Sequence, residues 1–256
     1  MVKQLLMGTM AFAFTVSASA ADITNPFYLP TKGQVGSITS ASFHKNEAKN
    51  SEFLGKSYDK VIHEELQYGL MDNLALVGGI GNTFDRTKES PLVSDKSDGN
   101  THFDVGMAWN VLTGPARLQV SARYGQDKLI QTEKGEYKYV RGEVKAGYQF
   151  KKFLPYVSVG EELPVAQSKG DDKPKYNAKI GVYQGACEVW ALDTGIRWIH
   201  DENGEQNGYN VEVEASYYLT PKSALSLYGT YLLKGEAKYD TDLYDKSVGM
   251  RLRWFF

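Results

Sequence analysis

Histidines are the side chains in this sequence best suited to acid–base chemistry near neutral pH. There are four, at His44, His63, His102 and His200. His102 precedes Asp104 by two residues and His63 precedes Glu65 by two, so in an extended strand each histidine shares a face with its carboxylate. Hydrolysis by a serine nucleophile needs a Ser within hydrogen-bond reach of a His, and a third group that orients the imidazole ring.

The sequence offers no clear set of nucleophile, histidine and orienting group. The order His-x-Ser does not occur, and no Asn is a convincing third member of a triad, so we expect His102 and Asp104 to form a polar pair rather than a catalytic one.

Calcium favours clustered oxygen ligands, and carboxylates gather in two loops at Asp201, Glu202, Glu205, Asp240 and Asp242. Such charge runs are usually solvated loops, so the sequence predicts no catalytic residue, no metal and no cofactor. Calcium binding by these loops stays an alternative.

The other charged residues alternate with apolar ones along segments of about 10 to 14 residues, which is the pattern of β-strands with two different faces. No amphipathic helix of useful length is predicted. We expect about twelve strands, over residues 34–45, 57–70, 74–85, 101–111, 116–125, 137–150, 153–163, 175–184, 187–199, 209–219, 224–234 and 243–256.

The composition excludes several classes of protein. The chain has 256 residues, a formal net charge of −2 and no run of eighteen apolar residues, which argues against both nucleic-acid binding and a helical membrane protein. With 17 Tyr, 11 Phe, 4 Trp and 25 Gly, it favours β structure. A lone cysteine, Cys187, excludes an internal disulfide.

The N-terminus predicts export. Lys3 is followed by an apolar stretch and by the small residues Ala18, Ser19 and Ala20, which is the pattern of a signal peptide. We therefore expect a signal peptide at residues 1–20, a periplasmic lead-in at 21–33 and the strands at 34–256.

The connections between the predicted strands alternate between short turns and long polar loops. This asymmetry is typical of bacterial outer-membrane barrels, with turns in the periplasm and loops outside the cell. The predicted fold is all-β, a closed antiparallel up-and-down transmembrane barrel of about twelve strands. A large soluble β-sandwich or a lipocalin-like barrel is the alternative.

Aromatic residues on the apolar faces favour the membrane barrel. Eight of them are spaced as two girdles that bracket an apolar band of about 25 Å: Phe103, Trp109, Trp190, Trp198, Tyr209, Tyr217, Tyr244 and Trp254. Glu64 fits less well, because it falls on the face with Ile62, Leu66 and Tyr68.

The last strand carries a family resemblance. Met250, Leu252, Trp254 and the terminal Phe256 alternate and end on an aromatic residue, which resembles the assembly signal of bacterial outer-membrane β-barrel proteins. The resemblance implies recognition by the barrel-assembly machinery. It also implies an integral protein of the outer membrane, in contact with its lipid and lipopolysaccharide, and in strand count the chain is similar to small monomeric porins.

The polar faces of the strands would line the barrel. We expect acidic residues in the lumen at Glu143, Asp193, Glu212, Glu214 and Asp245, and basic residues at Arg117, Arg123, Arg141, Lys145, Lys179, Arg197, Arg251 and Arg253. Opposite charges on different walls would produce a field across the lumen.

A charged lumen predicts a passive channel for small hydrophilic solutes, with a preference for anions because of the arginines. One alternative is a structural or adhesive barrel whose lumen is plugged by salt bridges. Another is an outer-membrane lipid hydrolase. An autotransporter translocator is disfavoured, because residues 21–33 leave no room for a passenger or a pore-filling helix.

Overall fold

The computed structural model describes residues 22–49, 54–89, 94–97, 100–129, 136–166, 173–187, 189–202, 206–237 and 241–256. The predicted signal peptide lies outside these residues. Within the described residues, no helix is long and apolar enough to cross a membrane.

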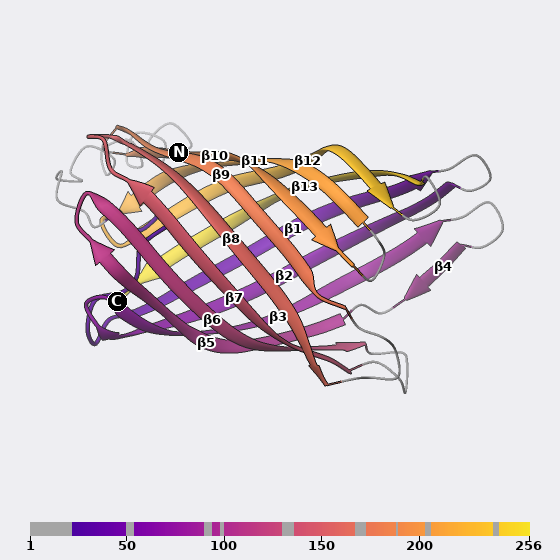
Figure 1. Cartoon of the computed structure of the whole chain (residues 1–256), viewed down its shortest axis with the longest axis horizontal. Coiled ribbons are helices and arrows are strands. Elements are labelled where there is room, and N and C mark those ends of the chain that lie inside the picture. Colours follow the sequence, from indigo (N-terminus) through magenta and orange to yellow (C-terminus); the bar gives the residue numbers. More distant parts are fainter. Residues whose placement is uncertain are drawn as a thin grey trace, which may run out of the picture.

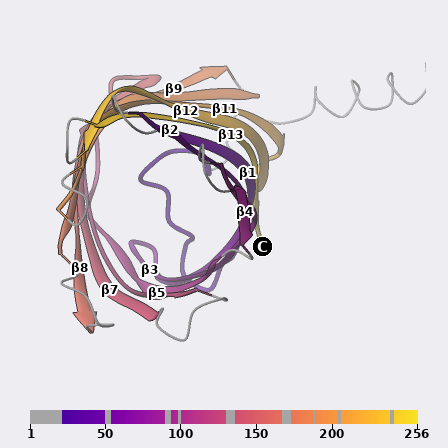
Figure 2. The same ribbon diagram turned by 90° about the vertical axis from the view of Figure 1, so that its right-hand side faces the viewer.

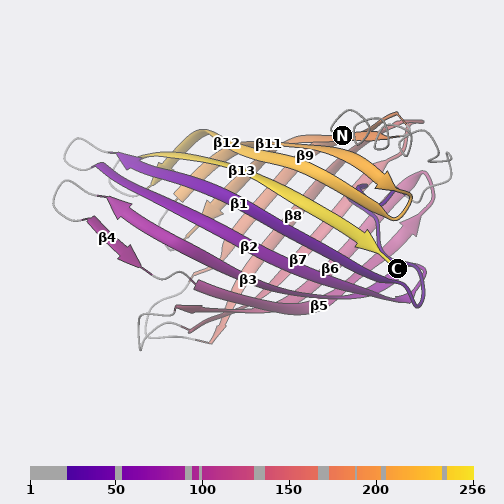
Figure 3. The same cartoon turned by 180° about the vertical axis from the view of Figure 1, so that it is seen from behind.

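Twelve strands close into one antiparallel barrel, because the first strand pairs with both the second and the last (Figures 1 and 3). Its strands are β1 Val35–Lys49, β2 Leu54–Met71, β3 Leu74–Glu89, β5 Asn100–Thr113, β6 Ala116–Leu129, β7 Glu136–Tyr148, β8 Phe153–Ala166, β9 Lys175–Cys187, β10 Trp190–Asp201, β11 Gln206–Thr220, β12 Ser223–Ala237 and β13 Thr241–Phe255. The predicted fold is confirmed. A short extra strand, β4 Ser94–Ser97, pairs only with the end of β3.

The lengths of the connections show which end of the barrel is which. Two residues separate β2 from β3, β5 from β6, β9 from β10 and β11 from β12, and four separate β7 from β8. These short turns share one end with the C-terminus (Figure 1), which is the periplasmic end of an outer-membrane barrel.

Exposure alternates along the strands with the period of two that the sequence predicts. On β8, Val157 and Val159 are about half exposed, whereas Ser158 is 2% exposed and Glu162 is 7% exposed. The apolar side chains therefore point outward and the polar ones point into the lumen. In an outer-membrane barrel this outer face contacts lipid.

Glu64 lies on this outer face, in regular register between Thr39 of β1 and Ile80 of β3. Its carboxylate accepts hydrogen bonds from two hydroxyls of β1, Ser37 Oγ at 2.5 Å and Thr39 Oγ1. The unbroken register on both sides shows that Glu64 does not lie in a β-bulge. Neighbouring hydroxyls instead satisfy a carboxylate on the apolar face.

Three local differences from the predicted strands have simple causes. The end of β3 continues into what the sequence predicts as a loop, because residues 86–89 pair with β4. Phe150 forms an isolated bridge with Phe153 around a turn in which Lys151 has φ of 51°, so β7 ends at Tyr148. Cys187 ends β9 rather than beginning β10.

Candidate functional site in the barrel lumen

The lumen contains two adjoining cavities, of about 440 Å³ and about 740 Å³. Both are lined by lumen-facing side chains. They share Glu143, Lys145, Arg197 and Arg251 of the wall, together with Pro26 and Tyr28 from the chain before β1.

Residues 22–31, which we call the N-terminal segment, run inside the barrel at its periplasmic end (Figure 2). Ile23 and Phe27 are buried in one apolar cluster with side chains near the short turns, including Leu154 of β8 and Ala224 of β12. Leu29 is buried against a second group on β3 and β5. The sequence places this segment before the barrel and does not indicate that it enters the lumen.

Polar contacts hold the N-terminal segment to opposite walls. Thr24 Oγ1 lies 2.8 Å from Tyr183 Oη on β9 and 2.6 Å from Tyr218 Oη on β11, and both tyrosines also contact Asp22.

Across the lumen, the carbonyl oxygen of Phe27 accepts a hydrogen bond from Asn110 Nδ2 on β5 at 2.9 Å. The carbonyl oxygen of Pro26 accepts one from Lys145 Nζ on β7 at 2.9 Å. The segment therefore spans and narrows the periplasmic end of the lumen.

Most charged side chains of the described lumen form ion pairs with side chains of nearby strands. Glu214 of β11 lies between Arg251 and Arg253 of β13, with Arg253 Nη1 at 2.6 Å from Glu214 Oε1. Glu212 of the same strand accepts from Arg197 Nε at 2.5 Å and lies 2.9 Å from Lys179 Nζ. These partners stand on strands one or two places away from β11. The pair of Arg123 on β6 with Glu65 on β2, at 2.6 Å, spans three places.

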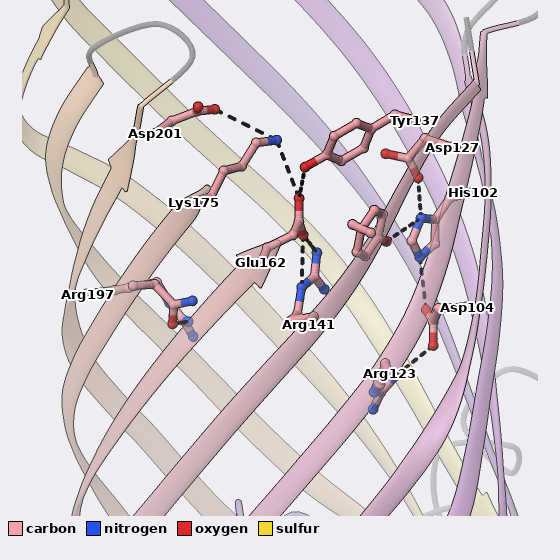
Figure 4. A network of polar contacts seen from close by, with 12 residues as sticks. His102, Asp104, Arg123, Asp127, Tyr137, Arg141, Glu162, Lys175, Arg197 and Asp201 are labelled. Carbon is pink, nitrogen blue, oxygen red and sulfur yellow. Dashed lines mark hydrogen bonds and ion pairs between the residues drawn. The ribbon is translucent and has the colours of Figure 1, made fainter. Parts of the chain in front are cut away.

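A second network lies on β7, β8, β9 and the end of β10, closer to the long loops (Figure 4). Glu162 accepts two hydrogen bonds from Arg141, at 3.1 Å and 2.5 Å, and one from Tyr137 Oη at 3.2 Å. Lys175 Nζ lies 3.6 Å from Glu162 and 3.7 Å from Asp201.

Every basic and acidic residue that we predicted for the lumen is on a lumen-facing position of its strand. The expected separation of charge between walls is wrong, because Glu212 and Glu214 are surrounded by cations of the neighbouring strands. Two cations differ from the others. Within the described part of the chain, neither Arg117 nor Lys145 forms an ion pair with a carboxylate, and Arg117 Nε is buried without a partner.

Two histidines from the strands on either side of β3 meet in the larger cavity. The rings of His63 on β2 and His102 on β5 have centroids 5.9 Å apart. One ligand atom from each of His63, His102 and Asp104 lies within 4.8 Å of the others, so this set could hold a metal ion. The pairing of His102 with Asp104 was predictable from their spacing, but the approach of His63 was not.

The structure shows a contact of His44 that the sequence does not predict. Ser42 Oγ lies 2.8 Å from His44 Nε2 on β1, in the order Ser-x-His rather than His-x-Ser. Among the described residues no carboxylate hydrogen bonds to His44 Nδ1, so the group that would orient a catalytic ring is not seen there.

The predicted girdle aromatics and assembly-signal residues lie on the outer face wherever the structure describes their side chains. Trp190 pairs with Tyr217, and Trp198 pairs with Tyr209 eight residues further along β10. The side chain of Tyr244 lies outside the described part. That these rings contact lipid headgroups, and that Phe256 is read by the assembly machinery, stay predictions. Of the loop carboxylates considered for calcium, Glu205 and Asp240 lie outside the described residues.

No protein-family model and no curated protein matches the sequence. Solved structures do match the fold. The COG4313 outer membrane channel from Pseudomonas putida F1 is 13% identical, with a TM-score of 0.67 over 92% of this chain and 100% of that one.

The translocator domain of the autotransporter NalP from Neisseria meningitidis is 10% identical, with a TM-score of 0.59 over 98% of this chain and 96% of that one. The toluene transporter TbuX from Ralstonia pickettii is 8% identical, with a TM-score of 0.51 over 91% and 92%. At these identities the similarity shows the fold, which is that of bacterial outer-membrane barrels.

Proposed function

We propose that this chain is a passive outer-membrane channel for small hydrophilic solutes, and that the N-terminal segment controls how far its periplasmic end is open. The observation that carries the proposal is the lumen, whose two adjoining cavities are lined by charged side chains. Cavities of this size hold small molecules, and charged groups need water or partners. Because most of the ion pairs join strands only one or two places apart, they support a wet passage rather than a salt-bridge plug.

The N-terminal segment is the main obstacle to passage. Its hydrogen bonds with Lys145, Asn110, Tyr183 and Tyr218 each contribute about 1 kcal/mol. A few such bonds, together with the packing of Phe27, hold the segment in place without a covalent link.

Any preference for anions depends on cations that no carboxylate neutralises. The sequence attributes this preference to the arginines in general, but Arg251 and Arg253 flank Glu214. Arg117 is the better candidate, because it stands near the periplasmic end and no described carboxylate forms an ion pair with it, whereas Glu143 lines both cavities beside Lys145 and offsets its charge. We therefore assign a weak anion preference to Arg117.

Single-channel recording in planar bilayers tests the channel. The wild-type protein is compared with a variant that loosens the N-terminal segment, Lys145→Met with Tyr183→Phe and Tyr218→Phe. We expect small unitary currents from the wild type and larger ones from the loosened variant. The control, Thr230→Val with Ser247→Ala, removes a 2.8 Å contact of the wall that does not involve the segment, and its current should equal that of the wild type.

If the protein is a structural or adhesive barrel instead, no unitary current is expected from either protein. If neither the folded wild type nor the loosened variant carries unitary current, the channel proposal is wrong. The lipid hydrolase has less support, because the Ser42–His44 contact faces the lumen rather than the lipid. Phospholipase activity that disappears in Ser42→Ala would overturn our choice.

A further inference from the structure

His63 and His102 lie in one row across three neighbouring strands. His63 of β2 pairs with Gly81 of β3, and Gly81 pairs with His102 of β5. Adjacent strands lie about 4.8 Å apart, so the two histidines would be separated by the side chain of the middle strand. Gly81 has none, which allows both imidazole rings to lean over β3 and face each other.

The next row repeats this arrangement with a carboxylate. Gly79 of β3 pairs with Asp104 of β5. A Cβ atom at Gly79 would lie 2.7 Å from His63 Nε2 and 2.8 Å from Asp104 Oδ2. Because the two glycines have no side chain, nitrogen and oxygen atoms of side chains on the flanking strands extend over β3.

We propose that His63 Nε2, His102 Nε2 and Asp104 Oδ2 bind a divalent transition-metal ion of the Zn²⁺ class. Imidazole nitrogen with one carboxylate is a donor set that suits Zn²⁺. At metal–ligand distances of about 2.0 to 2.1 Å, the ligand atoms of a tetrahedral site lie about 3.3 Å apart. One ligand atom of each residue already lies within 4.8 Å of the others, so small side-chain rotations would bring the three atoms to this spacing.

The atoms that do not face the ion are held by neighbouring groups. His102 Nδ1 lies 2.6 Å from Asp127 Oδ1 on β6, and Arg123 Nη1 donates to Asp104 Oδ1 at 3.1 Å (Figure 4). Metal-binding histidines usually donate their second N–H to a carboxylate in this way, which orients the ring. The geometry therefore orients His102 and Asp104 before an ion arrives.

The third ligand, His63, is the one whose ring is not held by a hydrogen bond in the described part of the chain. His63 makes no hydrogen bond with another described side chain, whereas His102 Nε2 and Asp104 Oδ2 lie 2.9 Å apart. A bound ion takes the place of the proton between these two atoms, which is released to water, and His63 becomes its third ligand. Because the cavity of about 740 Å³ reaches all three residues, a fourth position is open to water or to a solute. The site does not depend on the channel proposal.

Zinc titration of the full mature chain in detergent tests the proposal. The protein carries no affinity tag and is first stripped with a chelator, and binding of ZnCl₂ is followed by calorimetry. We expect one Zn²⁺ per chain, and a loss of affinity of at least about tenfold in His63→Ala and in Asp104→Asn. The matched controls are His44→Ala and His200→Ala, which remove the same kind of side chain elsewhere and should leave the affinity unchanged.

Two further variants separate ligation from general damage to the barrel. Gly79→Ala keeps every ligand but fills the space where His63 and Asp104 converge, so it should also lower the affinity. Asp127→Asn should lower it about 10- to 100-fold by releasing the His102 ring. All variants are compared as folded barrels by circular dichroism. Absence of Zn²⁺ binding by the folded wild type, or one-site binding that survives both His63→Ala and Asp104→Asn, would overturn the site.

Discussion

The ring of Phe255, in the last strand, packs edge-on against the ring of Tyr28, with centroids 4.8 Å apart. Phe255 is 1% exposed, and its ring also covers Gly36 at the start of β1, where a Cβ atom would collide with it. Tyr28 Oη in turn donates to Gln34 Oε1 at 3.0 Å. The N-terminal segment therefore packs against the seam between the first and last strands, and its position is coupled to the closure of the barrel.

Gly36→Ala should weaken this seam. The added methyl group must displace the Phe255 ring, and overpacking of this kind costs about 1 to 3 kcal/mol. We expect a lower free energy of unfolding in lipid vesicles, measured by urea titration. The control is Gly142→Ala on β7, where a Cβ atom meets no other atom within 4 Å. Equal stability of Gly36→Ala and Gly142→Ala would contradict the packing described.

Glu214→Gln should destabilise the barrel more than the loss of one hydrogen bond. It leaves Arg251 and Arg253 side by side without the carboxylate that they share. Removing one partner from a largely buried ionic cluster costs several kcal/mol, and we expect about 2 to 4 kcal/mol here. Urea titration in vesicles measures the change. The variant Glu214→Asp keeps a carboxylate at this position, so it should lose less stability than Glu214→Gln. A change below about 1 kcal/mol would mean that lumen water replaces the carboxylate.

Glu64→Leu should stabilise the barrel or leave it unchanged, although it removes the acceptor for Ser37 and Thr39. A carboxylate on the lipid face is unfavourable, and its removal should contribute about 1 kcal/mol. The same vesicle titration checks this value. If Glu64→Leu instead lowers the unfolding free energy, the hydrogen bonds with Ser37 and Thr39 outweigh the cost of the carboxylate and the prediction is wrong.

Arg117→Gln should shift the ion selectivity of the channel toward cations. Arg117 forms no ion pair with a described carboxylate, so its charge acts on ions in the narrow periplasmic part of the lumen. The reversal potential in a KCl gradient across a planar bilayer measures the shift. Lys175→Gln is the comparison, because Lys175 stands between Glu162 and Asp201 and its removal should have a smaller effect. A larger shift in Lys175→Gln would contradict the assignment.

Alternation of side chains was enough to assign the faces of most strands. Arg251 and Arg253 were placed in the lumen, and Met250 and Leu252 outside, from their order alone, because successive side chains of a strand point in opposite directions. Glu64 shows the limit of this argument. Alternation also places Glu64 on the outer face, but Ser37 and Thr39, whose hydroxyls satisfy its carboxylate, belong to a neighbouring strand and are invisible in the local pattern.

The sequence by itself determined the architecture, because strand periodicity, turn length and loop polarity are local properties that the chain carries wherever it folds. Only the tertiary structure decided which polar groups meet. His63 and His102 are brought together by the register of three strands and by Gly81 between them, and register is a relation between distant segments. The N-terminal segment enters the lumen for a similar reason, since Phe27 finds its apolar partners on strands that exist as a surface only after the barrel has closed.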